Sequence, residues 1–323
     1  MYLFTSVNLK SVPKSAVPIK LQDHDMGNNP QKGKGGGKKD KNHASNAQDG
    51  TTEPNSEGSD EEFFDQDEIA KQFKHRNERG VDAFSAKRTK PIIDPRLVQN
   101  FCFFRDKVVK EHFESAGIEI MDAFKYSPAI SLFRAKHKQR MLAIKIADLT
   151  KMDVSERSHQ KNDAEQRSKL KNERIVRFYH IGDYNTMLIV ALDYAERGSL
   201  EDLLIDNGAL SERLAMSMFN QIARGVRYMH RRKMAHRNLN LTHVLVTKGY
   251  NTKLTGFKYS VICDGQPVDT FCGSAPFLPP EVLLQQPYSP YPADVWALGV
   301  ILFAMANDGM PYASSHDFPV NKL

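Results

Sequence analysis

Four positions decide which chemistry this chain could perform: Lys145, Asn238, His243 and Gly256. Lys145 lies in a short β-rich run, where its ammonium group could face water or bind a phosphate. Asn238 offers a neutral amide, which has no basic lone pair to accept a proton from a substrate hydroxyl. Histidine is a poor ligand for magnesium, which prefers oxygen donors, and glycine has no side-chain ligand at all. These residues provide a candidate phosphate contact but neither a base nor a metal ligand.

The spacing of four short elements resembles that of the protein kinases. The run Ala143-Ile144-Lys145 is similar to the family's Val-Ala-Ile-Lys, whose lysine contacts the α and β phosphates of ATP. His236-Arg237-Asn238 lies 91 residues after that lysine, and Gly256-Phe257-Lys258 begins 18 residues after the asparagine. Pro279-Pro280-Glu281 stands where Ala-Pro-Glu is usual. Chance does not easily assemble four elements in this order.

Three longer strings narrow the resemblance. They are Thr270-Phe271-Cys272-Gly273-Ser274, the segment from Asp294 to Leu302, and Met310-Pro311-Tyr312. They resemble the testis-specific serine/threonine kinases, a branch related to the calmodulin-dependent and AMP-activated kinases with a link to male germ cells. The resemblance covers about residues 115–312. It implies an α+β fold of two lobes, a small antiparallel β-sheet lobe and a mainly helical lobe.

The residues that perform phosphoryl transfer in that family are replaced here. Asn238 stands where an aspartate accepts the substrate's proton, and Asn240 replaces a lysine near the transferred phosphate. His243 and Gly256 replace the two metal ligands, so we expect no magnesium site. Other residues also fill the three glycine positions of the phosphate-binding loop, where we expect their side chains to crowd the phosphates: Ala123, Lys125 and Pro128.

The resemblance implies that the nucleotide pocket is retained. Lys145 is the predicted phosphate contact, and Asp163 stands at the position of its glutamate partner, with Glu165 close by. The surrounding sequence, 160–171, has almost no apolar face, which leaves open whether the ion pair forms. Five positions match residues that enclose the adenine ring or form the hinge beside it: Ile130, Ala143, Leu192, Tyr194 and Leu245.

The resemblance also assigns structural and regulatory positions. His236 and Phe257 match the stacked column that joins the two lobes, and Asp294 matches the aspartate that holds the backbone of the catalytic loop. Thr270 matches a threonine that is phosphorylated in the family, and Arg237 matches an arginine that helps to order the same loop. Thr270 could equally be an unmodified loop residue.

The elements that must position these residues can be read from hydrophobic patterning. The runs 118–121, 129–133 and 141–146 predict the strands of a small antiparallel sheet. Beyond residue 193 helical periodicity dominates, because Leu214, Met218, Ile222 and Val226 fall on one helix face. The run 295–306 is apolar all round, which predicts a buried helix.

The chain divides into five predicted segments. Residues 1–93 are polar and segregated into basic and acidic blocks, which predicts a disordered region. An accessory helix is predicted over 94–114, followed by the first lobe at 115–192 and the second at 193–315, with a tail at 316–323. Glu281 lacks the arginine that pairs with it in the family's later helices, so we expect it to be exposed or the second lobe to be incomplete.

Composition limits the function classes. The net charge of +6 is mild and favours a solvated surface over nucleic-acid binding. The three cysteines are too few and too scattered for a disulfide framework, which predicts free thiols in the cytoplasm or nucleus. Residues 1–4 do not begin a signal peptide, and the longest apolar run, 295–306, is too short to span a membrane.

The leading hypothesis is a catalytically inactive pseudokinase that binds a protein partner, such as an active kinase or its substrate, and serves as its scaffold or regulator. One alternative is an active serine/threonine kinase, which would need a carboxylate such as Asp193 or Asp202 to reach the metal position. The other is a nucleotide-sensing module that binds ATP without magnesium. No membrane or nucleic-acid partner is expected.

Overall fold

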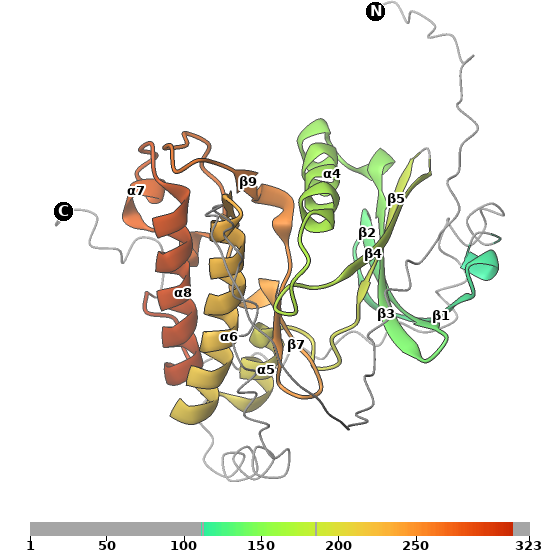
Figure 1. Ribbon diagram of the computed structural model, residues 1–323, viewed down its shortest axis with the longest axis horizontal. Coiled ribbons are helices and arrows are strands. Elements are labelled where there is room, and N and C mark those ends of the chain that lie inside the picture. The colour runs from blue at the N-terminus through green and yellow to red at the C-terminus, as the bar shows by residue number, and fades with distance from the viewer. Residues whose placement is uncertain (1–110, 112, 185, 313–323) are drawn as a thin grey trace, which may run out of the picture.

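The computed structural model describes residue 111 and residues 113–184 and 186–312 (Figure 1). Glu111 and residues 113–115 are helical and lead into the first strand. The predicted segment 1–93, nearly all of the predicted helix 94–114, Cys102 and everything after residue 312, including the tail 316–323, lie outside the described residues.

Five antiparallel strands form the first lobe, in the order β1-β2-β3-β5-β4. They are β1 (Ile118–Tyr126), β2 (Ile130–His137), β3 (Arg140–Asp148), β4 (Phe178–Tyr184) and β5 (Met187–Asp193). Side chains alternate between the two faces, so that Phe133 and Ala135 of β2 are fully buried. The predicted strands were too short, because pairing continues beyond the apolar runs through residues such as Lys136, which lies opposite Met141.

One helix, α4 (Val154–Ser168), lies beside this sheet (Figure 1). It begins earlier than the predicted 160–171 segment because Asp153 caps it, accepting a hydrogen bond from the Glu156 backbone N–H at 2.8 Å. Its buried face consists mostly of polar and charged residues, including Asp163 and Arg167. Ionic contacts rather than an apolar stripe therefore hold α4 in place.

The second lobe is mainly helical. Its helices are α5 (Leu200–Asn207), α6 (Glu212–Arg231), α7 (Pro280–Leu283) and α8 (Pro290–Asn307). Two short antiparallel pairs complete it, β6 (Met234–Ala235) with β9 (Val261–Ile262) and β7 (Val244–Val246) with β8 (Thr252–Leu254). The two-lobed α+β fold predicted from the sequence is confirmed (Figure 1).

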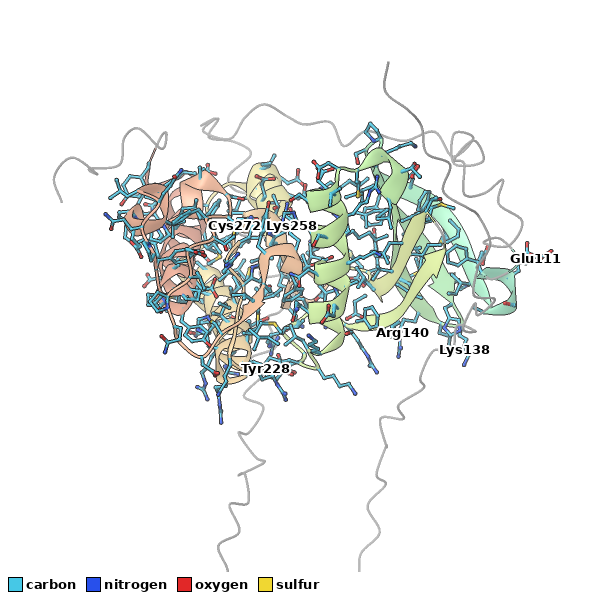
Figure 2. All side chains as sticks on the ribbon, turned by 90° about the horizontal axis from the view of Figure 1, so that it is seen from above. Glu111, Lys138, Arg140, Tyr228, Lys258 and Cys272 are labelled. Atoms are coloured by element: carbon cyan, nitrogen blue, oxygen red, sulfur yellow. The ribbon has the colours of Figure 1, made fainter. Side chains whose placement is uncertain are left out.

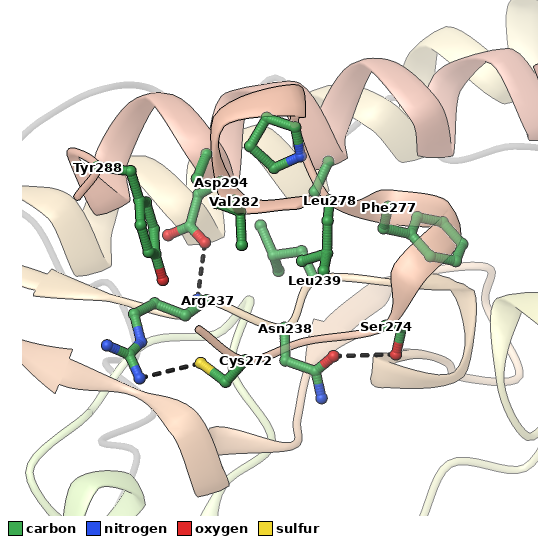
Figure 3. Close-up of a pocket in the computed structure, with 13 residues that line it drawn as sticks. Arg237, Asn238, Leu239, Cys272, Ser274, Phe277, Leu278, Val282, Tyr288 and Asp294 are labelled. Atoms are coloured by element: carbon green, nitrogen blue, oxygen red, sulfur yellow. Dashed lines mark hydrogen bonds between the residues drawn. The ribbon is translucent and has the colours of Figure 1, made fainter. Parts of the chain in front are cut away.

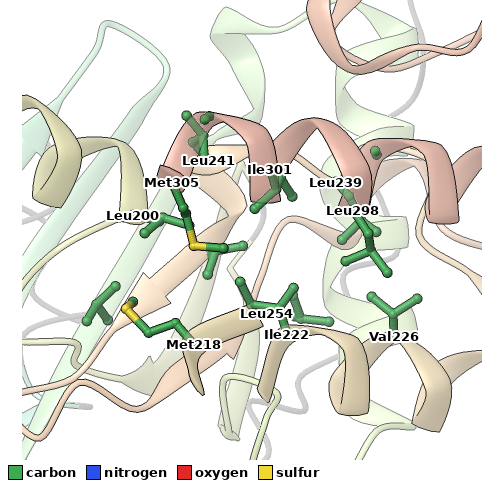
Figure 4. Packing of buried hydrophobic residues seen from close by; sticks show 14 of the residues in the cluster. Leu200, Met218, Ile222, Val226, Leu239, Leu241, Leu254, Leu298, Ile301 and Met305 are labelled. Atoms are coloured by element: carbon green, nitrogen blue, oxygen red, sulfur yellow. The ribbon is translucent and has the colours of Figure 1, made fainter. Parts of the chain in front are cut away.

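Helices α6 and α8 pack against each other to form the core of this lobe (Figure 4). The predicted α6 face is confirmed, since Leu214, Met218, Ile222 and Val226 are all buried. From α8, Ile301 and Met305 are fully buried against it. The expectation that the 295–306 helix is buried all round was wrong, because one side of α8 exposes Val295 and Phe303 to solvent. None of the helices in the described ranges combines the length and apolar character needed to cross a membrane.

Candidate functional site

An ion-paired cluster around Asp163 lies where the two lobes meet. Lys145 of β3 donates from Nζ to Asp163 Oδ2 at 3.0 Å, and Arg167 donates to Oδ1 at 2.9 Å. The backbone N–H of Phe257 donates to the same Oδ1 at 2.8 Å. Burial alone would raise the pKa of Asp163, but the charges of Arg167 and Lys145 prevail and hold it well below its usual range. The carboxylate stays ionised and fully paired.

The sequence left open whether Lys145 forms an ion pair, and the structure shows that it pairs with Asp163. Glu165, the nearby alternative, is exposed and pairs with Lys169 one helical turn later. Asp163 is one methylene shorter than the glutamate usual at this position, and it still reaches Lys145 Nζ at 3.0 Å. The contact fixes the ammonium group of Lys145 where the two lobes meet, and its side chain is only 17% exposed.

A column of stacked side chains joins the two lobes through this cluster. The rings of His236 and Phe257 have centroids 5.2 Å apart, as the sequence predicted for this column. The Phe257 ring also contacts Arg167, whose guanidinium lies 4.9 Å from the ring centroid in a cation–π arrangement. A charged side chain thus continues the column, and Asp163 neutralises it.

Sequence reasoning missed two residues of α4 that hold this arrangement. Arg167 is one helical turn beyond Asp163, a spacing that could have predicted the pair. Asn162 donates from Nδ2 to the backbone carbonyls of Lys258 and Ser260, at 2.9 and 3.2 Å. Nothing in the local sequence signals that second contact, which joins α4 to the segment after Phe257.

His243 and Gly256, which stand where the resembling family has its two metal ligands, lie against each other. His243 is largely buried, and its Nδ1 donates to the Asn238 carbonyl at 2.8 Å. A Cβ atom at position 256 would lie 2.6 Å from His243 Cγ and closer still to Cδ2. Gly256 also has a φ of 83°, in the left-handed region that glycine adopts without strain. The imidazole fills the space that a side chain at 256 would need.

The imidazole of His243 is uncharged at neutral pH. Burial, followed by the neighbouring His236, lowers the pKa of His243 to about 4. Burial also lowers the pKa of His236, whose Nε2 donates to the Thr255 carbonyl at 2.9 Å. Both rings are therefore neutral, and neither brings charge to the site.

Asn238 is buried in a polar network of the catalytic loop (Figure 3). Its Oδ1 accepts hydrogen bonds from Ser274 Oγ at 3.0 Å and from Asn240 Nδ2 at 3.2 Å. Asn240 Oδ1 in turn accepts from Thr242 Oγ1 and from the His243 backbone N–H. The amide carbonyl of Asn238 is thus used for structure. Its side chain joins the loop to the segment that contains Ser274.

Arg237 and Thr270, the predicted regulatory residues, are not brought together. Arg237 has a φ of 62°, and its guanidinium donates to Cys272 Sγ at 2.9 Å and to the Tyr259 carbonyl at 3.0 Å (Figure 3). Thr270 is exposed; its Oγ1 donates to Asp269 Oδ1 at 3.5 Å, and its backbone carbonyl accepts from Tyr288 Oη at 3.3 Å. Cys272 is a free thiol, as predicted, and burial raises its pKa.

The role predicted for Asp294 is visible in its contacts. Its two carboxylate oxygens accept hydrogen bonds from the backbone N–H groups of His236 and Arg237, both at 2.8 Å. His230 Nε2 also contacts Oδ2 at 2.8 Å. These contacts fix the backbone of the loop. Beside it, a cavity of about 10 Å³ is large enough for only one water molecule.

The turn between β1 and β2 is held by hydrogen bonds between its own residues. Ser127 Oγ donates to the Ile130 carbonyl and accepts from the Ile130 N–H, both at 3.0 Å. The Ser127 N–H also donates to the Ile130 carbonyl at 2.8 Å. These donors are consumed within the turn and are not presented to a phosphate.

The residues at the three glycine positions differ in exposure. Ala123 is buried in the core of the first lobe, while Lys125 and Pro128 are exposed. Irregular pairing in β1, with register shifts after Ile120 and after Ala123, changes which face each residue takes. Crowding of a phosphate by these side chains stays a prediction.

The five predicted adenine-enclosing positions lie in one apolar cluster. Ala143 and Leu192 are direct neighbours across β3 and β5 and are buried. Ile130, Tyr194 and Leu245 pack against the same cluster. Phe124 of β1 lies edge-on to Tyr194, with ring centroids 5.6 Å apart. The structure therefore brings the five positions together in one apolar cluster, and their role in enclosing an adenine ring stays a prediction.

Comparison with known sequences shows which family has this architecture. The sequence profile of the protein kinase domain matches residues 127–322, which is more than half of the chain. The chain belongs to the protein kinase family. Its relatives are in the group related to the calmodulin-dependent and AMP-activated kinases.

Three relatives of this kinase domain are named as protein kinases. The serine/threonine-protein kinase kin-29 of Caenorhabditis elegans is 32% identical over 58% of this chain and 23% of its own length. Serine/threonine-protein kinase SIK1 of Mus musculus is 31% identical over 57% of this chain and 24% of its own length. NUAK family SNF1-like kinase 2 of Homo sapiens is 31% identical over 56% of this chain and 29% of its own length. The chain thus spans less than a third of these relatives.

The family's usual ligand includes a metal ion. Protein kinases bind ATP together with magnesium, which oxygen ligands hold. The magnesium positions are occupied by a neutral imidazole and a glycine packed against it. These residues do not fit the metal.

Proposed function

We propose that this protein kinase domain is catalytically inactive and acts by binding a protein partner. The observation that carries the proposal is the packing of His243 against Gly256, which leaves neither an oxygen ligand nor space for one. Loss of the base at Asn238 alone removes roughly 10² to 10⁴ in rate, about 3–5 kcal/mol. The losses need not add, but one retained lysine does not offset them.

The alternative of an active kinase would need a carboxylate displaced into the site, and both candidates are engaged elsewhere. Asp193 accepts hydrogen bonds from Tyr179 Oη at 2.6 Å and from Lys253 Nζ at 3.2 Å. Asp202 accepts from the backbone N–H and the hydroxyl of Ser199 as part of the cap of α5. These contacts favour the inactive reading.

What the domain retains is a rigid surface suited to recognition. The two lobes are joined by the hydrogen bonds of Asp163 with the Phe257 N–H and of Arg167 with Thr255, and the bonds of Asp294 hold the loop of the second lobe. An active kinase or its substrate, in the cytoplasm or nucleus, is the partner that we propose. Within the family, the strings 270–274 and 294–302 support a relation to the testis-specific kinases.

A second function, binding of ATP without magnesium, is favoured by the apolar cluster around Ala143 and Leu192. Lys145 would supply the charge that contacts a phosphate. In this reading the nucleotide stabilises the surface that the partner recognises.

A phosphotransfer assay tests the proposal. Purified full-length chain is incubated with magnesium and labelled ATP, with general protein substrates, and with the Lys145→Ala variant as the control. The proposal expects the same background in both proteins. Incorporation that depends on Lys145 would contradict it, whichever substrate reveals it.

A further inference from the structure

The second half of α6 carries an exposed basic face. Arg224, Arg227 and Arg231 are exposed and lie three and four residues apart, which places them on one side of the helix. Arg232 follows at the end of the helix, and Lys171 is exposed beside it. We call these five residues the α6 basic face.

Tyr228 contacts two residues of the α6 basic face. Its hydroxyl accepts a hydrogen bond from the Lys171 backbone N–H at 3.0 Å, and the guanidinium of Arg232 lies 4.7 Å from its ring centroid. Long nitrogen-tipped side chains project from the molecule on both sides of Tyr228 (Figure 2). The two contacts of Tyr228 place Lys171 and Arg232 beside the helix that carries the other three cations.

The basic face has few opposing charges. Among the described residues, no carboxylate forms an ion pair with Lys171, Arg224, Arg231 or Arg232. Cations at the carboxyl end of a helix are stabilised by its dipole, which accounts for Arg231 and Arg232 but not for Arg224. Like charges one turn apart repel each other by about 0.2–0.5 kcal/mol. An anionic occupant would relieve that repulsion.

The chain itself contains a matching anion. Residues 57–68 hold two phenylalanines, Phe63 and Phe64, no basic residue and seven acidic ones: Glu57, Asp60, Glu61, Glu62, Asp65, Asp67 and Glu68. We propose that this acidic segment docks on the α6 basic face of the same molecule. Carboxylates would pair with the arginines, and the two phenylalanine rings would find apolar surface at Tyr228 and at Met216, which is 44% exposed on the same helix.

The tether is long enough for intramolecular docking. From Glu68 to Phe113, the first residue of the continuous described range, there are 113 − 68 = 45 residues. A chain of that length spans about 150 Å at full extension, and less where the predicted helix over 94–114 shortens it. Tethering raises the effective concentration of the acidic segment at α6 to the millimolar range or near it. The segment therefore competes well against free acidic peptides, and a partner that binds α6 must displace it.

Photocrosslinking of the full chain tests the docking. Benzoylphenylalanine is placed at position 64, and the monomer is irradiated at low protein concentration after nuclease treatment. The expected crosslinks join residue 64 to peptides within 212–233. The yield should fall about tenfold in the variant R224E/R227E/R231E and again for the wild type in about 1 M salt, because exposed ion pairs are weak and screened.

Two further variants make the result specific. The triple change K136E/K138E/R140E reverses three exposed charges on the β2–β3 hairpin and should leave the yield unchanged. The changes E61R, E62R and D65R, added to the reversed α6 variant, should restore the crosslink. Crosslinks to other regions only, to a second copy or to nucleic acid, or a yield indifferent to charge reversal on α6, would overturn the proposal.

Discussion

The imidazole of His243 occupies the space beside Gly256 that any side chain at that position would need. The two replacements are therefore complementary. The family's aspartate was not simply lost from position 256, since its volume is filled by a neutral ring that is bonded to the Asn238 carbonyl. A magnesium site cannot be rebuilt by changing one of the two residues.

Restoring an aspartate at position 256 alone should destabilise the fold. Gly256→Asp forces the new Cβ against His243, and overpacking of this kind costs about 1–3 kcal/mol. The double variant H243N/G256D should recover most of that loss because asparagine is smaller than the imidazole. Urea denaturation measures both. If G256D alone is as stable as the wild type, the two side chains do not compete for space.

Asn238→Asp should be tolerated structurally and still not produce a kinase. An aspartate can accept the same hydrogen bonds from Ser274 Oγ and Asn240 Nδ2, so the free energy of unfolding should change by less than about 1 kcal/mol. Phosphotransfer should stay at background because the metal positions remain closed. Activity gained from this one substitution would show that the roles assigned to His243 and Gly256 are wrong.

Asp163→Ala should be among the most damaging single changes. It leaves Arg167, which is 2% exposed, without its carboxylate and also frees Lys145. Breaking a buried pair in this way costs about 3–5 kcal/mol. Glu165→Ala, two residues away on the exposed side of α4, is the matched control and should cost less than about 0.5 kcal/mol. Comparable losses in the two variants would refute the central position given to Asp163.

Stability should decrease as the pH falls from about 6.5 toward 4. The folded state holds the pKa of His243 at about 4, below the value of about 6.5 in an unfolded chain. The unfolded state therefore binds more protons across this window, and protonation favours unfolding by up to about 3 kcal/mol. His236, whose pKa burial also lowers, acts with the same sign. Asp163 loses its charge only at lower pH.

The pH prediction is checked by chemical denaturation at intervals between pH 7 and 4.5. The variant H243N lacks the shifted group and should show a shallower decrease than the wild type. Equal slopes in the two proteins would mean that His243 titrates normally and is not buried as described.

Much of the site could be predicted from the sequence because its motifs keep family spacing. The β3 lysine, the apolar α6 face and the Asp294 contacts follow from motif and periodicity. The contacts of Arg167 with Thr255 and of Arg237 with Cys272 could not be predicted, since they join residues 88 and 35 positions apart. The orientation of Ala123 was also hidden, because a register shift in β1 moves side chains from one sheet face to the other.

The most direct test is the melting temperature of the full chain with ATP, with and without magnesium. The account predicts that magnesium adds nothing to any shift that ATP causes in the wild type, because His243 closes the metal position. In H243N/G256D, which restores both oxygen ligands, a magnesium-dependent increase should appear. A wild-type shift that requires magnesium and matches that of the double variant would contradict the account.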